Sequence, residues 1–71
     1  MKPYLSNGTR IKIIDENHTW FNQNAVVIGN KVEPKPYPFL VYILELLEGS
    51  IPPKEHPFMR HTARQDQIRI L

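Results

Sequence analysis

The sequence predicts an all-β domain whose short strands close into a small barrel. Apolar residues alternate with polar ones or form short β-branched runs, and seven prolines and three glycines separate these runs. The chain has 71 residues, so we expect one domain over residues 1–71. Closing the sheet would remove the exposed edges that are a liability in a small all-β protein.

The clearest strand signals stand near the two ends of the chain. Residues 9–14 alternate, with isoleucines on one face and Arg10 and Lys12 on the other. Residues 68–71 alternate again. Period-two alternation is typical of a half-buried strand, so we expect both segments to be strands, the first with Ile11 and Ile13 toward the core.

Three further strands are predicted between them. The β-branched run 25–28 is expected to stop at Gly29-Asn30. Residues 39–45 are apolar at nearly every position, and their Val, Tyr and Ile content favours a strand over a helix. Residues 58–61 form a short candidate strand, and 63–66 a tight turn.

The strand at 39–45 carries a possible interaction surface. Phe39, Val41 and Ile43 are expected to point inward. The remaining large side chains would then form an outer apolar face: Leu40, Tyr42 and Leu44. Such a patch is uncommon on a free monomer and indicates either a buried protein interface or a cover formed by the 50–57 loop with Ile51.

Trp20 and Phe21 stand together in a loop that is otherwise polar. Large aromatic residues are enriched at the centres of protein interfaces, so the pair is a candidate anchor for a partner. The alternative interpretation is a lid folded over an open end of the barrel.

Basic residues gather in the last third of the chain: Lys54, Arg60, His61, Arg64 and Arg69. They could contact an acidic protein, lipid headgroups or phosphate, or they could be ordinary solvated charges. The formal charge of +2 is small, and the charges are interspersed rather than arranged in the basic stripe of a dedicated nucleic-acid binder.

Catalytic, metal and cofactor sites are not predicted. The sequence has no cysteine, and His18, His56 and His61 lack the spacing of metal ligands. The adjacent carboxylates Asp15 and Glu16 would point apart on an extended chain. We therefore expect a protein that is not an enzyme and holds no cofactor.

Several segments together resemble one protein family. Gly8-Thr9-Arg10-Ile11-Lys12-Ile13 is followed without a gap by Trp20-Phe21-Asn22, and then by Val27. Tyr37-Pro38-Phe39-Leu40-Val41 and Asp66-Gln67-Ile68 continue the match. These segments resemble photosystem I reaction-centre subunit IV, the PsaE family, over about two thirds of the chain.

The resemblance implies a five-stranded SH3-like barrel that sits on the stromal or cytoplasmic face of photosystem I. Members of the family help ferredoxin to dock, and an acidic ferredoxin calls for positive charge on the docking subunit. The opening Met1-Lys2-Pro3-Tyr4 lacks the apolar stretch of a signal peptide, and no run is long enough for a membrane span. We expect a cytoplasmic protein, peripheral at the thylakoid membrane through its complex.

The chain departs from the family at several positions. Tyr42 stands where the family has an arginine, Ile14-Asp15 follows the first strand where a basic residue is frequent, Ala25 replaces a glycine, and residues 46–62 do not match. These replacements shift the expected partner from ferredoxin toward an apolar protein surface. The predicted partner-binding residues are Arg10, Lys12, Trp20, Phe21, Leu40, Tyr42, Leu44, Arg60 and Arg64.

Two other functions stay open. One is a nucleic-acid-binding barrel with aromatic residues that stack on bases and cations that contact phosphate. Its candidate residues are Tyr4, Trp20, Phe21, Arg10, Lys12 and Lys31. The other is a regulatory adaptor that binds a signalling protein through the outer apolar strand.

Overall fold

All strands of the protein join one antiparallel sheet. The computed structural model describes residues 4–71. Met1–Pro3, which belong to the segment expected not to be a signal peptide, lie outside the described residues. The elements are β1 (Arg10–Ile13), β2 (Asn24–Glu33), β3 (Phe39–Leu46), β4 (Arg60–Ala63), the 3-10 helix η1 (Gln65–Gln67) and β5 (Ile68–Ile70). Their order in the sheet is β4-β3-β2-β1-β5, which confirms the prediction of an all-β chain with five strands.

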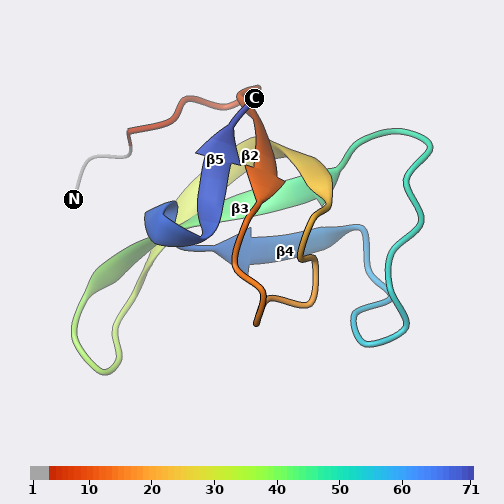
Figure 1. The fold of residues 1–71 in the computed structure, drawn as a ribbon. Coiled ribbons are helices and arrows are strands. Elements are labelled where there is room, and N and C mark those ends of the chain that lie inside the picture. Colours follow the sequence, from red (N-terminus) through yellow and green to blue (C-terminus); the bar gives the residue numbers. More distant parts are fainter. Residues whose placement is uncertain (1–3) are drawn as a thin grey trace.

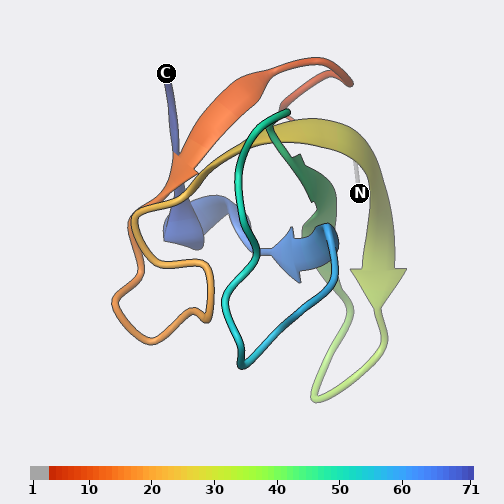
Figure 2. The same cartoon turned by 90° about the vertical axis from the view of Figure 1, so that its right-hand side faces the viewer.

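The sheet is strongly curved, as two perpendicular views show (Figures 1 and 2). Within residues 4–71, β4 and β5 remain its two edges, and no strand pairing joins them. The β2–β3 hairpin projects on the side opposite to the 47–59 segment, which links β3 to β4 (Figure 1). In the described part of the chain, no helix has the length and apolarity needed to cross a membrane.

Strand β2 is longer than predicted because Gly29-Asn30 does not end it. The register against β3 shifts between Val27 and Gly29, which marks a bulge. A glycine inside a strand often marks such a bulge, where the strand bends and continues. The bend lets β2 pair with β1 through Asn24–Val26 and still run along β3 as far as Glu33.

The predicted orientation of β3 is wrong. Tyr42 and Leu44, expected on an outer face, are fully buried, and Leu40 is half-buried against the core. Because this run is apolar at nearly every position, alternation cannot fix its phase. The register fixes it instead: Leu44 lies opposite Val27, and Tyr42 lies opposite the buried Ala63.

The buried hydroxyl of Tyr42 has its own partners. It accepts hydrogen bonds from the backbone N–H groups of Tyr4, at 2.7 Å, and Leu5, at 3.1 Å. A satisfied hydroxyl allows a tyrosine to enter a core. The proposed cover for an outer patch is also wrong, since Ile51 is 82% exposed.

The core lies on the concave side of the curved sheet. It contains Leu5, Ile11, Ile13, Trp20, Ala25, Val27, Tyr42, Leu44, Leu46, Ala63 and Ile68. The burial of Ile11 and Ile13 confirms the predicted inward face of the first strand. Strand β4 begins two residues later than expected, at Arg60, and η1 overlaps only the second half of the predicted turn at 63–66.

Candidate docking surface

The outward face of β1 and β5 carries three basic side chains. Arg10 and Lys12 alternate with the buried isoleucines of β1, so they point away from the core. Lys12 lies directly opposite Arg69 in the β1–β5 ladder. Paired residues of an antiparallel ladder share a face, with Cβ atoms about 4.5–5.5 Å apart. Arg10, Lys12 and Arg69 therefore form one cluster, which we call the basic face.

No ion pair among residues 4–71 neutralises the basic face. Ion pairs among residues 4–71 join Lys31 to Glu33, Arg60 to Glu45, and Arg64 to Asp66, at 2.9–3.1 Å between nitrogen and oxygen. None of these pairs includes a residue of the basic face. Like charges directly opposed across two strands destabilise a sheet, so the pairing of Lys12 with Arg69 opposes folding.

Glu45, the acidic residue that neighbours the basic face, already forms an ion pair with Arg60. Along the same outer face, Val26 lies opposite Arg10, and Glu45 lies opposite Val26 on the next strand. Glu45 accepts a hydrogen bond from Nε of Arg60, which lies on its far side in β4. The positive charge of the basic face is thus left available to an external acidic group.

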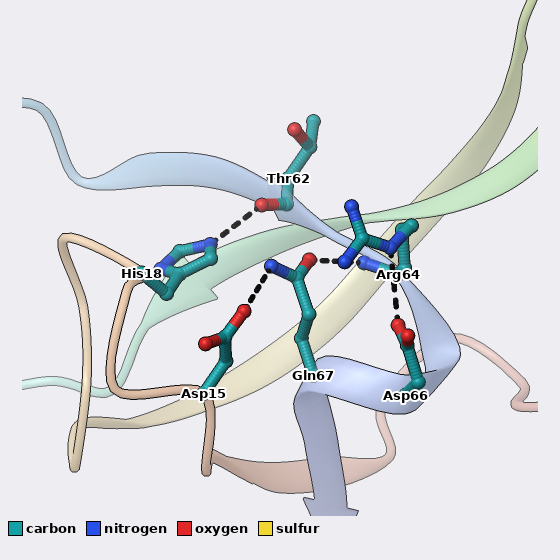
Figure 3. A network of polar contacts seen from close by, with 6 residues as sticks. All are labelled: Asp15, His18, Thr62, Arg64, Asp66 and Gln67. Atoms are coloured by element: carbon teal, nitrogen blue, oxygen red, sulfur yellow. Dashed lines mark hydrogen bonds and ion pairs between the residues drawn. The ribbon is translucent and has the colours of Figure 1, made fainter.

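A polar network fixes the loop between β1 and β2 beside this face (Figure 3). The Gln67 amide donates to Asp15 at 2.8 Å, and its oxygen accepts from the Arg64 backbone N–H at 2.8 Å. The Asn17 backbone N–H donates to the second carboxylate oxygen of Asp15. Hydrogen bonds from Gln67 and then from Asn17 lower the pKa of the Asp15 carboxyl below its ordinary value.

Trp20 closes one end of the core beneath the histidines. Its side chain is fully buried, whereas the neighbouring Phe21 is 46% exposed. The rings of His56 and His61 meet the indole edge-on, with centroids 5.7 and 5.3 Å away. This burial supports the lid interpretation of Trp20 and removes it as an exposed anchor.

The three histidines converge, which the sequence interpretation missed. The ring centroids of His56 and His61 lie 3.9 Å apart, and those of His18 and His61 lie 4.3 Å apart. They come from the 47–59 segment, β4 and the β1–β2 loop, so no sequence spacing could have shown the cluster. Within the residues that the structure describes, no three His, Asp or Glu side chains are arranged to hold a metal ion.

Hydrogen bonds engage both ring nitrogens of His18 and of His61. Nε2 of His18 faces the Thr62 carbonyl at 2.8 Å and must donate, while its Nδ1 accepts from the Trp20 backbone N–H. Nδ1 of His61 accepts from the Thr62 N–H at 2.7 Å, and its Nε2 donates to Thr19 at 2.8 Å. Burial first, and then His18 and His56, lower the pKa of His61 from 6.5 to about 4.

A hollow of about 250 Å³ lies at the other end of the sheet, near the tip of the β2–β3 hairpin. It is lined by Pro36, Tyr37, Phe39 and Arg64. The Tyr37 and Phe39 rings meet at 66° with centroids 6.4 Å apart. Arg64 is held by Asp66 at its margin, so the hollow presents mainly apolar surface.

The structure divides the predicted partner-binding residues into three groups. Arg10 and Lys12 lie together on the basic face, to which the structure adds Arg69. Arg60, Arg64 and Phe21 are exposed but separate, and both arginines are ion-paired. The members of the third group point into the core and are not available as exposed contacts: Trp20, Leu40, Tyr42 and Leu44.

Comparison with known proteins adds no further assignment. The chain matches no family model, and the searches of curated proteins and of solved structures find no match either.

Proposed function

We propose that this chain is a non-enzymatic docking protein that binds an acidic protein surface through its basic face. The observation that carries the proposal is the Lys12–Arg69 pair, two like charges directly opposed on an outer face, with Arg10 beside them. This arrangement opposes folding, and an acidic partner would offset its cost.

Because Tyr42 and Leu44 are buried, the side chains that remain exposed favour a different kind of partner. The side chains that suggested an apolar partner do not lie on the outer face of β3, and the charge on β1 and β5, unpaired among residues 4–71, remains. Complementary charge raises association rates and gives binding that weakens with salt. An acidic electron-transfer protein such as ferredoxin fits this surface better than an apolar one.

The strand order and η1 before the last strand support an SH3-like barrel as the finer description of the fold. With the resemblance of residues 8–22 to photosystem I subunit IV, this makes the electron-acceptor side of photosystem I the proposed host. The protein would then be cytoplasmic and peripheral at the thylakoid membrane.

Two of the residues proposed to contact nucleic acid are not free to do so. Trp20 is buried and cannot stack on a base, and Lys31 is paired with Glu33. Tyr4 and Phe21 keep exposed rings. The adaptor alternative depended on the outer apolar strand, whose central residues point inward.

Titration of the isotope-labelled chain with ferredoxin tests the proposal by nuclear magnetic resonance. At about 0.01 M salt, where charges act over about 30 Å, we expect amide shifts centred on Arg10, Lys12 and Arg69. Raising the salt to 0.2 M should weaken these shifts. Shifts centred on the hairpin hollow, or none at all, would count against the proposed surface.

A single-stranded oligonucleotide of equal charge serves as the control ligand. The docking proposal predicts smaller shifts with this ligand than with ferredoxin. Equal or larger shifts at Tyr4 and Phe21 would favour the nucleic-acid alternative.

A further inference from the structure

The histidine cluster, defined as His18, His56 and His61, contains every histidine of the chain. Each ring comes from a different segment, and His61 lies between the other two. The cluster covers Trp20, through the edge-on contacts of His56 and His61. In Figure 2, the β1–β2 loop and the 47–59 segment lie beside each other at this end of the sheet.

His56 attaches the 47–59 segment to the rest of the domain. Its ring stacks on His61 at an interplanar angle of 26°, and its Nε2 donates to the Arg60 carbonyl at 2.6 Å. Two large apolar side chains of the segment are mostly exposed: Ile51 is 82% exposed, and Phe58, whose ring meets that of His56, is 67% exposed. The aromatic contact between this segment and Trp20 is therefore made by the imidazole of His56.

We propose that the histidine cluster is an acid-sensitive latch. While the rings are neutral, His56 holds the 47–59 segment closed over Trp20. When the rings take up protons, the segment is released and Trp20 is uncovered while the sheet stays folded.

Protonation would break contacts that the neutral rings make. Nδ1 of His18 and Nδ1 of His61 each accept a backbone N–H, and a proton on either atom would set two donors against each other. Two charged rings at the observed 3.9 Å separation would also repel.

Of the charged groups around the cluster, the Asp15 carboxylate attracts a charged His18, but no carboxylate among residues 4–71 acts in this way on His61. The groups whose charge acts on His61 are His18 and His56. Of the nearby carboxylates, Asp15 keeps its charge while it accepts hydrogen bonds from Gln67 and Asn17. Glu45 is ion-paired with Arg60, and Asp66 is ion-paired with Arg64. The remaining charged neighbours on the 47–59 segment are the exposed Lys54 and Glu55.

The indole N–H of Trp20 lowers the free energy needed to open the latch. Its Nε1–H is buried and has no hydrogen-bond partner among the described residues. A buried donor without a partner carries the free-energy cost of desolvation, and access to water removes that cost. Opening the latch would give the indole this access.

Fluorescence provides a direct test because Trp20 is the single tryptophan of the chain. Between pH 7.5 and 4.5, we expect a red-shifted emission and at least a twofold rise in the acrylamide quenching constant. Far-UV circular dichroism and the amide signals of β1 to β3 should stay unchanged over this range. Continued protection of Trp20 at pH 4.5, or exposure that appears only as the sheet unfolds, would overturn the proposal.

Two substitutions at His56 separate the latch from general acid sensitivity. His56→Ala should leave Trp20 accessible to quencher already at pH 7.5, with the sheet intact. His56→Phe keeps an aromatic ring against His61 and Trp20 without titrating, so the midpoint of Trp20 exposure should fall by at least one pH unit. A protected Trp20 in His56→Ala, or an unchanged midpoint in His56→Phe, would contradict the latch.

Discussion

The basic face and the Trp20 end of the sheet use their polar groups in opposite ways. At the Trp20 end, His18 and His61 each use both ring nitrogens in hydrogen bonds, and the indole is fully buried. On the basic face, Lys12 and Arg69 lie opposite each other without an acidic partner among residues 4–71. Apart from the indole N–H of Trp20, the Trp20 end satisfies its polar groups within the chain, whereas the charges of the basic face have no acidic partner among residues 4–71.

This difference indicates where stability and binding are located. Substitutions in a completed, buried region mainly lower the free energy of unfolding. Substitutions that relieve opposed charges on an exposed face can raise it, while they remove the charge that attracts a partner. The predictions below test this separation, beginning with the largest expected effect.

Trp20→Ala should cause the largest loss of stability. Truncation of a fully buried tryptophan costs about 3–5 kcal/mol, and a domain of this size has about 4–10 kcal/mol in total. Urea denaturation followed by circular dichroism measures the loss. Phe21→Ala is the matched control, because the neighbouring ring is 46% exposed and should cost far less. Equal losses would contradict the lid interpretation of Trp20.

Tyr42→Phe should cost about 1–3 kcal/mol, because it removes the acceptor of the Tyr4 and Leu5 backbone N–H groups. The same substitution on an exposed partner-binding tyrosine would leave the free energy of unfolding almost unchanged. Tyr37→Phe, on a ring that is 69% exposed, provides that comparison. Denaturation of the two variants thus tests the corrected orientation of β3.

The free energy of unfolding should fall as the pH decreases from 6.5 toward 4. The pKa of His61 is lowered to about 4 in the folded chain, so the unfolded chain binds more protons in this window. The contribution of neutral His61 to the free energy of unfolding is fully present above pH 6.5 and is lost as the pH falls toward 4. Protonation of Asp15 lowers the free energy of unfolding only at lower pH, because the pKa of its carboxyl in the folded chain lies below the ordinary value of 3.8. Denaturation at pH 7.5, 6.0 and 4.5 measures the trend, and a flat profile would contradict it.

Lys12→Glu should give the smallest change, and with the opposite sign. It places a carboxylate opposite Arg69 and converts a repulsive cross-strand pair into an attractive one, worth about 0.2–1 kcal/mol. Thermal denaturation at low salt should therefore show a slightly higher midpoint than in the parent chain. A lower midpoint would mean that Lys12 contributes to folding in a way that the ladder does not show.

Much of the fold could be predicted from the sequence, because period-two alternation is a strong signal where one strand face is polar. Ile11 and Ile13 against Arg10 and Lys12 gave the correct inward face. The uniform apolar run of β3 gave the correct strand but the wrong phase. Its orientation depends on the register with β2 and β4, which is a long-range property.

The candidate site was only partly predictable. Arg10 and Lys12 could be identified from alternation, but their neighbour Arg69 joins them only through the pairing of β1 with β5. The histidine cluster forms where the β1–β2 loop, the 47–59 segment and β4 meet at one end of the sheet. Neither juxtaposition has a local sequence signal, since each is created by the topology.

The affinity of the doubly reversed variant Lys12→Glu/Arg69→Glu for ferredoxin tests the central claim most directly. Isothermal titration calorimetry at low salt should give a dissociation constant at least tenfold higher than that of the parent chain, or about 1.4 kcal/mol of lost binding. The control Lys35→Glu/Lys54→Glu makes the same change in net charge at exposed positions away from β1 and β5, and should retain most of the affinity. Equal affinities for the two doubly substituted variants, both still folded, would contradict the assignment of docking to the basic face.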